Sequence, residues 1–169
     1  YKGKLAYVPQ QGWLRNTTLR ENILFGNEYD PVFYNKVLSL CELKDDCKIL
    51  PGGDLTEIGE KGINLSGGQK QRVALARAVY SRADIYIIDD ALSALDAHVG
   101  RKIYENVLNK ILKGKTILFV THALHYVRGC DKLVVMKDGQ IVEIGTPAEL
   151  ENDPHSEFNK LNEIGRASC

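Results

Sequence analysis

The stretch "LSGGQKQRVALARAVYSRADIYIIDD", from Leu65 to Asp90, constrains the fold of this chain more than any other. Two glycines open a predicted helix that runs from Gly67 to about Arg82. The run "ADIYIIDD" that follows is continuously apolar and ends in two acids, which is typical of a strand buried in a parallel sheet. A helix that leads directly into such a strand predicts an α/β fold.

The rest of the sequence repeats this alternation of strands and helices. Strands are predicted in "KLAYV", in "KTILFVTH", which we expect to be a second buried strand, and in "KLVVMKDGQIVEIG", where Asp138-Gly139 indicates a hairpin. Helices are predicted in "TTLRENILFG", with a threonine as its N-cap, and in "DPVFYNKVLSLCEL", with Asp30 as its N-cap. An amphipathic helix is predicted in "HVGRKIYENVLNKILKGK", closed by Gly114, and one or two more helices in the tail "PAELENDPHSEFNKLNEIG". The glycine-rich "LPGGDLTEIGEKGINL" predicts a loop or a small hairpin. Short links between alternating elements favour a parallel central sheet.

The composition argues against several classes of protein. Lys plus Arg and Asp plus Glu both number 22, whereas a nucleic-acid-binding domain usually carries a basic excess. No apolar run approaches the roughly 18 residues that a membrane-spanning helix needs. The cysteines form no C-x-x-C pair, so ordinary thiols are expected at Cys41, Cys47, Cys130 and Cys169. The first residues carry neither an initiator methionine nor the apolar stretch of a signal peptide, so we expect a fragment.

The start of the predicted helix at Gly67 has the features of an anion site. Ser66 and Gln69 stand in the S-x-x-Q relation of a capping box, which alone would indicate only a capped helix. Gly67 and Gly68 each cost roughly 1 kcal/mol relative to alanine inside a helix, so something should offset them. Close approach of an anion to the bare N–H groups of a helix N-terminus is the natural candidate.

Polar residues end two of the predicted strands, at Asp89-Asp90 and at Thr121-His122. Ligands of open α/β sheets bind outside the carboxyl ends of the strands. Neighbouring residues of a strand face opposite sides, so Asp89 would organise Mg²⁺ through its water shell and Asp90 would polarise an attacking water. A structural carboxylate is an equal alternative for this pair. Taken singly, His122 and Gln10 are ambiguous.

The order of these residues resolves the ambiguity. Gln10 ends "AYVPQ", and "LSGGQ", "IYIIDD", "SALD" and "THALHYV" follow in that order. The chain thereby resembles the nucleotide-binding domain of ATP-binding-cassette (ABC) transporters across nearly its whole length. In that family these segments are the Q-loop, the signature motif, the Walker B strand, the D-loop and the H-loop.

The resemblance implies a role for each matching residue. Gln10, Asp90 and His122 would be catalytic. Asp89 and Gln10 would bind Mg²⁺, and Ser93 and Asp96 would belong to the D-loop. Ser66, Gly67, Gly68 and Gln69 would contact, in trans, the γ-phosphate of an ATP held by a second nucleotide-binding domain. The implied fold is a P-loop NTPase-like ABC ATPase domain, with a helical subdomain at about 12–75 and with 1–11 and 76–169 in the RecA-like core and the C-terminal hairpin and helices.

Further segments resemble the first nucleotide-binding domain of the C subfamily, the multidrug-resistance-associated exporters. They are "YVPQQGWLRNTTLRENILFG", "LTEIGEKGINLSGGQKQR" and "LSALDAHVGRKIYENVL". Most ABC domains carry glutamate where this chain has Asp90, and retracting a carboxylate by about 1 Å can cost on the order of 10²-fold in rate. Ala91 stands where the family usually has proline, and no functional consequence is attached to it. The resemblance implies an exporter on the cytoplasmic face of a membrane, with the region after Gln10, including Trp13 and Leu14, facing its transmembrane domains. Core packing is an equal alternative for Trp13.

Two other interpretations remain open. A soluble ABC ATPase of the DNA-repair or translation-factor kind would share the signature and Walker B motifs, but its coiled-coil heptads are missing here. A non-catalytic or regulatory half-domain is favoured by Asp90 and by the lack of a G-x-x-x-x-G-K-[ST] loop, the Walker A motif, in these residues. We expect that loop and its strand upstream of Tyr1, so that strands 85–89 and 116–120 lose a neighbour and leave apolar surface exposed.

The 169-residue chain is therefore expected to bind ATP weakly or not at all, because it lacks the loop that would grip the phosphates in cis. Isothermal titration of the isolated chain with ATP measures this directly. A micromolar dissociation constant would contradict the expectation.

Overall fold

The fold is described from a computed structural model that covers residues 2–60 and 62–167, with side chains as far as residue 162. Two compact units, Tyr1–Thr121 and His122–Cys169, are each described by themselves. Cys169, and Lys61 within the predicted loop, lie outside the described residues. Within the described part of the chain, no helix is long and apolar enough to cross a bilayer.

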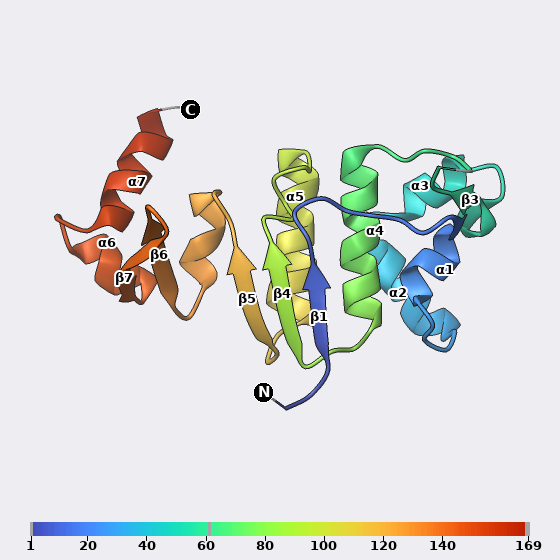
Figure 1. Ribbon diagram of the computed structural model, residues 1–169, viewed down its shortest axis with the longest axis horizontal. Coiled ribbons are helices and arrows are strands. Elements are labelled where there is room, and N and C mark those ends of the chain that lie inside the picture. Colours follow the sequence, from blue (N-terminus) through green and yellow to red (C-terminus); the bar gives the residue numbers. More distant parts are fainter. Residues whose placement is uncertain (1, 61, 168–169) are drawn as a thin grey trace. The chain divides into compact units, whose positions relative to one another are not determined.

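A three-stranded parallel sheet forms the centre of the first unit (Figure 1). Its strands are β1 (Leu5–Val8), β4 (Ile85–Asp89) and β5 (Thr116–Val120), in the order β1-β4-β5. The register joins Val8 to Ile88 and Ile88 to Phe119. The α/β fold with a parallel sheet is confirmed, and the carboxyl ends of β4 and β5 share one edge, as the sequence predicted.

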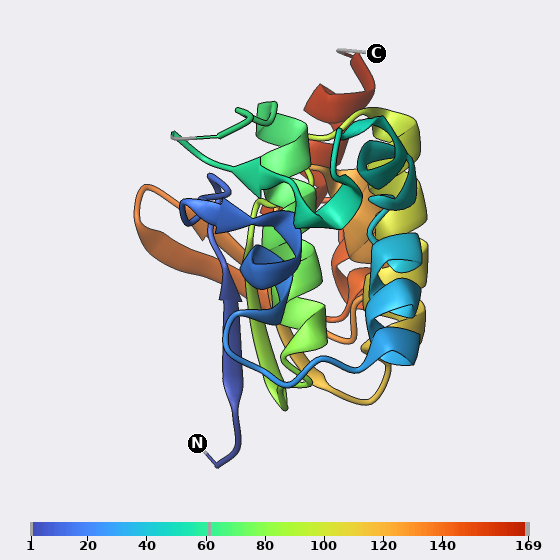
Figure 2. The ribbon, with the colours of Figure 1, turned by 90° about the vertical axis from the view of Figure 1, so that its right-hand side faces the viewer.

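Helices cover one face of this sheet. Figure 2 shows α4 (Gly67–Tyr80) and α5 (Ala97–Ile103) on the same side of the strands. Alternate side chains of the strands, including Val8, Tyr86 and Ile88, are buried beneath them. The Phe119 ring of β5 lies 6.2 Å from the Tyr104 ring, between centroids. Burial of this alternating set fixes the register, because a slip by one residue would turn every one of these side chains to solvent.

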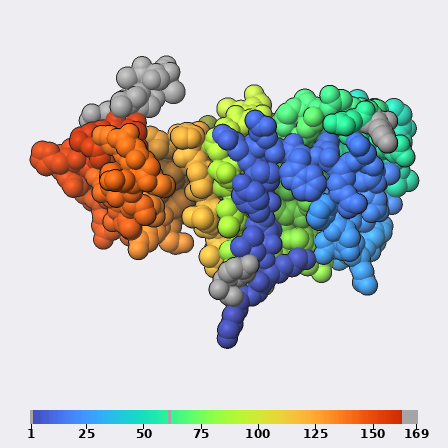
Figure 3. All heavy atoms as spheres, in the orientation of Figure 1, coloured from blue at the N-terminus to red at the C-terminus, as the bar shows by residue number. Residues whose placement is uncertain are grey.

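The opposite face of the sheet is uncovered among the described residues of the first unit. Tyr7 of β1 is 55% exposed, and Leu118 and Val120 of β5 are 57% and 45% exposed. Figure 3 looks onto this face. The expectation of a fully buried strand at 116–120 is therefore wrong, whereas the expectation of exposed apolar surface is confirmed. The expectation that strand 85–89 lacks a neighbour is also wrong, because β1 and β5 pair with both of its edges.

A cluster of short elements lies beside α4, in the segment between β1 and α4. They are β2 (Thr17–Thr18), α1 (Leu19–Leu24), α2 (Pro31–Leu40), α3 (Lys44–Ile49), η1 (Gly53–Leu55) and β3 (Glu57–Ile58). Thr18 caps α1 by accepting from Glu21 N–H, and Asp30 caps α2 by accepting from Phe33 N–H, as predicted. The glycine-rich segment contributes β3, which pairs with β2.

The predicted amphipathic helix after β4 is present but changes its hydrogen bonding halfway. The α-helix α5 continues as the π-helix η2 (Tyr104–Ile111), and Ile103 and Val107 on its apolar stripe are fully buried. The helix ends at Ile111, and Gly114, which was predicted to close it, adopts a φ of 84° in the turn that follows.

The second unit is a hairpin with flanking helices. It contains η3 (Leu124–Gly129), β6 (Leu133–Lys137), β7 (Gln140–Gly145), α6 (Pro147–Asn152) and α7 (Glu157–Ala167). Asp138 and Gly139 both adopt positive φ, at 49° and 75°, so the predicted two-residue turn is confirmed. Val127, Leu133, Val135, Leu150 and Phe158 form its core.

Two glycines of the first unit should respond oppositely to a methyl group. A Cβ at Gly12 would lie 2.6 Å from the Lys70 carbonyl oxygen, whereas a Cβ at Gly67 would meet nothing within 4 Å. We expect Gly12→Ala to lower the free energy of unfolding by about 1–3 kcal/mol through overpacking. Gly67→Ala should leave it unchanged or raise it by up to about 1 kcal/mol, because alanine favours the helix. Urea denaturation measures both variants, and equal losses would contradict this assignment.

Candidate functional site

The first turn of α4 begins at Ser66 with the predicted capping box. Gln69 N–H donates to Ser66 Oγ at 3.3 Å, and Ser66 N–H donates to Gln69 Oε1 at 2.8 Å. Ser66 and Gly67 are exposed. The capping box satisfies two N–H groups of this turn, and the early N–H groups of a helix have no partner within the helix. The turn therefore offers backbone donors toward solvent.

The two glycines of this turn are in different situations. A Cβ at Gly68 would approach the Ala94 carbonyl oxygen to 3.2 Å, so tight packing within the chain favours glycine there. A Cβ at Gly67 would meet nothing within 4 Å, and its φ is not positive. Neither packing against the described residues nor backbone conformation requires glycine at 67. The open space in front of Gly67 could admit a ligand to bare backbone.

The segment after β1 is joined directly to α4. Gln71 of α4, although buried, donates from Nε2 to the Pro9 carbonyl at 2.8 Å. Three residues after Pro9, Gly12 lies against the backbone of Lys70. Gln10, which lies between these contacts, is exposed. The structure thus fixes the backbone on both sides of Gln10, whose side chain is exposed.

The two acids after β4 have distinct environments. Asp89 is the last residue of the strand, and its Oδ2 accepts from the Tyr7 hydroxyl at 3.3 Å. Asp90 leaves the strand with φ of 45°, its N–H donates to the Val120 carbonyl at 2.8 Å, and its side chain is buried. The Oδ1 of Asp90 has no hydrogen-bond partner among the described residues. A buried carboxylate oxygen normally accepts a hydrogen bond, so this oxygen is available to a donor other than the described residues.

The segment Ser93–Asp96 connects these parts. Ser93 Oγ donates to the Asp90 carbonyl at 2.7 Å, and Asp96 caps α5 by accepting from His98 N–H at 2.9 Å. Ala94, between them, is the residue that Gly68 approaches. The structure therefore brings the first turn of α4, Asp90 and the Ser93–Asp96 segment together in one unit.

His122 is exposed and begins the second unit, two residues after β5 ends. It is described only within that unit.

Sequence reasoning missed two groups that contact the predicted residues. Tyr7 meets Asp89, and desolvation together with the Asp89 charge raises the pKa of Tyr7. Asp46 of α3 accepts from Gln69 Nε2 at 2.7 Å. The contact with Tyr7 could have been predicted from the strand register. Tyr7 pairs with Ile87, and Asp89, two residues further along its strand, lies on the same face of the sheet. No pattern in the sequence indicates that Asp46, 23 residues before Gln69, faces it.

Trp13 belongs to an aromatic cluster with one arginine at its centre. The Arg77 guanidinium lies 4.2 Å from the Trp13 ring centroid and 5.0 Å from that of Phe25. Arg77 also donates from Nε to the Asn22 carbonyl at 2.8 Å. Burial, and secondarily the charge of Arg15, lowers the pKa of Arg77 to about 10. Trp13 remains 47% exposed and Phe25 42% exposed, so packing against the rest of the chain covers only part of each side chain.

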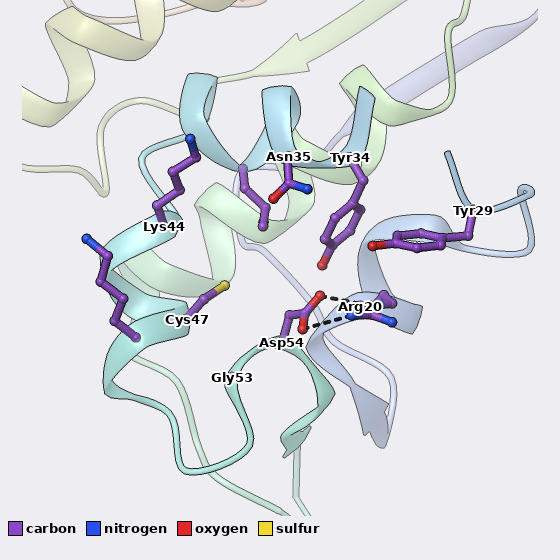
Figure 4. A pocket seen from close by; sticks show the side chains of 10 residues that line it. Arg20, Tyr29, Tyr34, Asn35, Lys44, Cys47, Gly53 and Asp54 are labelled. Atoms are coloured by element: carbon purple, nitrogen blue, oxygen red, sulfur yellow. Dashed lines mark hydrogen bonds and ion pairs between the residues drawn. The ribbon is translucent and has the colours of Figure 1, made fainter. Parts of the chain in front are cut away.

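A pocket of about 420 Å³ lies among α1, α2, α3 and η1, away from the predicted residues (Figure 4). Arg20 donates to both carboxylate oxygens of Asp54, at 2.8 and 3.1 Å. The Tyr34 side chain points toward this pair, and burial followed by the charge of Asp54 raises its pKa. Burial also raises the pKa of the neighbouring Cys47 to about 11. None of the predicted site residues lines this pocket.

Comparison with known proteins agrees with this geometry. The family model described as ABC transporter matches residues 1–93. Human ATP-binding cassette sub-family C member 2 is 57% identical over 151 residues, which is 88% of this chain and 10% of that protein. ABC transporter C family member 12 of Dictyostelium discoideum is 53% identical over 164 residues, 97% of this chain and 12% of that protein. Multidrug resistance protein mrp-7 of Caenorhabditis elegans is 59% identical over 146 residues, 85% of this chain and 10% of that protein.

This chain thus spans about a tenth of the length of these relatives, and its similarity to them is spread over most of its residues. The signature-like turn, the paired acids and the parallel sheet lie within or overlap the matched region. The chain belongs to the ABC transporter family and is similar to its C-subfamily members.

Proposed function

We propose that this chain is part of the ATP-binding and ATP-hydrolysing module of a C-subfamily exporter, which drives transport by ATP-dependent pairing of two nucleotide-binding domains. The observation that carries the proposal is the first turn of α4, where Gly67 has open space in front of it that no contact with the described residues explains. The turn would bind the γ-phosphate of an ATP gripped by the partner domain, through bare N–H groups and the Ser66 hydroxyl.

The acids and the glutamine would act at this chain's own nucleotide. Asp90, whose Oδ1 lacks a partner, would orient and polarise the water that attacks the γ-phosphate. Gln10 would approach the same phosphate from its exposed position beside α4. His122 would hold the γ-phosphate from the segment after β5, and the Ser93–Asp96 segment would meet the partner domain.

A magnesium ion fits the groups that the chain offers. Carboxylate and amide oxygens are the ligands that Mg²⁺ prefers, often through its water shell. Asp89 retains an oxygen beyond the one that Tyr7 occupies, and Gln10 is exposed, so both could hold the ion's waters. When bound, the ion would neutralise charge on the phosphates. The chain's own contribution is to fix Asp89 at the end of β4 through Tyr7.

The exposed part of the Trp13 cluster would face the transmembrane domains. Trp13 follows Gln10 by three residues and is tied to α4 through Arg77, whose Nη2 donates to the Trp13 carbonyl at 3.2 Å. A displacement of Gln10 could therefore move Trp13, and with it the surface that faces the transmembrane domains, because both segments are bonded to α4. On this proposal the chain lies at the cytoplasmic face, residues 12–75 form the helical subdomain, and 1–11 with 76–169 belong to the core and its C-terminal hairpin and helices.

Gly67→Ala in the full-length protein should separate function from stability. A methyl group would occupy the space reserved for the phosphate, so we expect ATP turnover to fall at least about tenfold, since small misplacements at a reacting centre cost that much or more. The melting temperature should not fall, because none of the described residues comes within 4 Å of the new methyl group. Turnover equal to that of the parent protein would remove the basis of the proposal.

Asp90→Glu in the full-length protein should raise ATP turnover. The additional methylene carries the carboxylate about 1 Å further toward the attacking water, which can be worth on the order of 10²-fold. Steady-state phosphate release at saturating ATP measures the effect, and nucleotide binding by fluorescence titration serves as the control. Unchanged or lower turnover with binding intact would count against the role given to Asp90.

A further inference from the structure

The side chain of Asp46 touches the first turn of α4 from a neighbouring helix. Asp46 belongs to α3, and its Oδ1 accepts from Gln69 Nε2 at 2.7 Å. The same carboxylate accepts from both terminal nitrogens of Arg72, one turn further along α4. The two charged side chains are only 13% and 16% exposed, so solvent screens this pair far less than it screens a surface ion pair.

Gln69 joins this carboxylate to the capping box. Its Oε1 accepts from Ser66 N–H at 2.8 Å while its Nε2 donates to Asp46. An amide has one acceptor end and one donor end, so the two contacts together fix its orientation. A continuous series of hydrogen bonds therefore runs from Arg72 through Asp46 and Gln69 to the backbone of Ser66.

The link before α3 is anchored in the same place. Arg72 Nη1 also donates to the carbonyl of Glu42, a residue whose φ of 52° is unusual for a side chain of its kind. The side chain of Glu42 in turn pairs with Lys102 of α5 at 3.3 Å. Arg72 thus holds both α3 and the chain that enters it, so α3 has little freedom to move without moving the start of α4.

We propose that Asp46 is a positioning residue for the phosphate-binding turn. It holds the Gln69 amide and, through it, sets the direction of Ser66 and of the bare N–H groups of Gly67 and Gly68. The inference rests on the proposed function of that turn and adds to it a group from α3. As long as residue 69 is glutamine, position 46 needs an acceptor without donors of its own, because three N–H groups converge on its two oxygens.

Exchange of donor and acceptor between the two side chains tests this role. Asp46→Asn replaces one accepting oxygen by an NH₂ group. This NH₂ group must face an N–H donor of either Gln69 or Arg72, so one hydrogen bond is lost. Gln69→Glu still accepts from Ser66 N–H, and so keeps the capping box, but turns an oxygen toward Asp46. The double variant D46N/Q69E restores the bond with reversed polarity, since the new amide can donate to the new carboxylate.

The first measurement needs no transport activity and uses the 169-residue chain. Amide hydrogen exchange by NMR reports on the N–H groups of Ser66 and Gln69, and the amides of Val73 and Leu75 inside α4 serve as controls. We expect each single variant to speed exchange at Ser66 and Gln69 about tenfold, the loss expected from one charge-assisted hydrogen bond, and the double variant to restore it. The control amides should keep their protection.

The second measurement uses the full-length protein. Each single variant should lower kcat for ATP hydrolysis about tenfold, with a smaller change in KM. The reason is that the turn contacts the reacting γ-phosphate, whereas other groups bind the rest of the nucleotide. D46N/Q69E should recover most of the loss. A purely structural ion pair would not be rescued by a neutral residue at position 46.

Three results would overturn the proposal: unchanged exchange at Ser66 and Gln69 in Asp46→Asn, a double variant no better than either single variant, or loss of protection throughout α4 in both single variants. If instead exchange behaves as expected but turnover in the parent protein does not depend on Gly67, the positioning role stands and the proposed function of the turn fails.

Discussion

Side chains of α4 donate hydrogen bonds to backbone carbonyls of the segments that surround it, and these bonds organise the first unit. The pairs are Gln71 to Pro9, Arg72 to Glu42, Arg77 to Asn22 and Tyr80 to Glu28. The acceptors lie 30 to 62 residues away along the chain. Burial of apolar side chains stabilises the packing of these segments on the helix, but it does not fix their positions along it, because the hydrophobic effect is non-directional. Directional bonds to backbone select one arrangement.

This arrangement explains why the candidate site lies at one end of α4. The helix is held along its length by Gln71, Arg72, Arg77 and Tyr80, so its first turn can be exposed and still have a defined direction. The parallel sheet places Asp89 and Asp90 at its carboxyl edge, and the Ser93–Asp96 segment bridges from there to Gly68. The exposed first turn of α4 suits an anion, because the N–H groups of a helix N-terminus carry partial positive charge.

Local signals predicted most of the secondary structure correctly. The caps at Thr18, Asp30 and Ser66 and the turn at Asp138-Gly139 depend on neighbouring residues, so the sequence carries them in full. The neighbours of β4 and the exposure of β5 were predicted wrongly, because an apolar run does not state which strands flank it or which face is covered. The matching order of motifs identified the candidate site residues, while their partners Tyr7 and Asp46 were missed.

Residue patterns alone were enough to predict the α/β class, the family and most of the helices and strands, because caps, periodicity and motif spacing act over a few residues or are carried by residue identity. They did not predict α3 or η3. Only the tertiary structure decided that Gly68 is explained by packing and Gly67 is not, that Asp90 keeps a buried oxygen without a donor, and that Asp46 reaches Gln69. These are contacts between segments far apart in the chain, and their geometry follows from how the helices pack on the sheet and on one another.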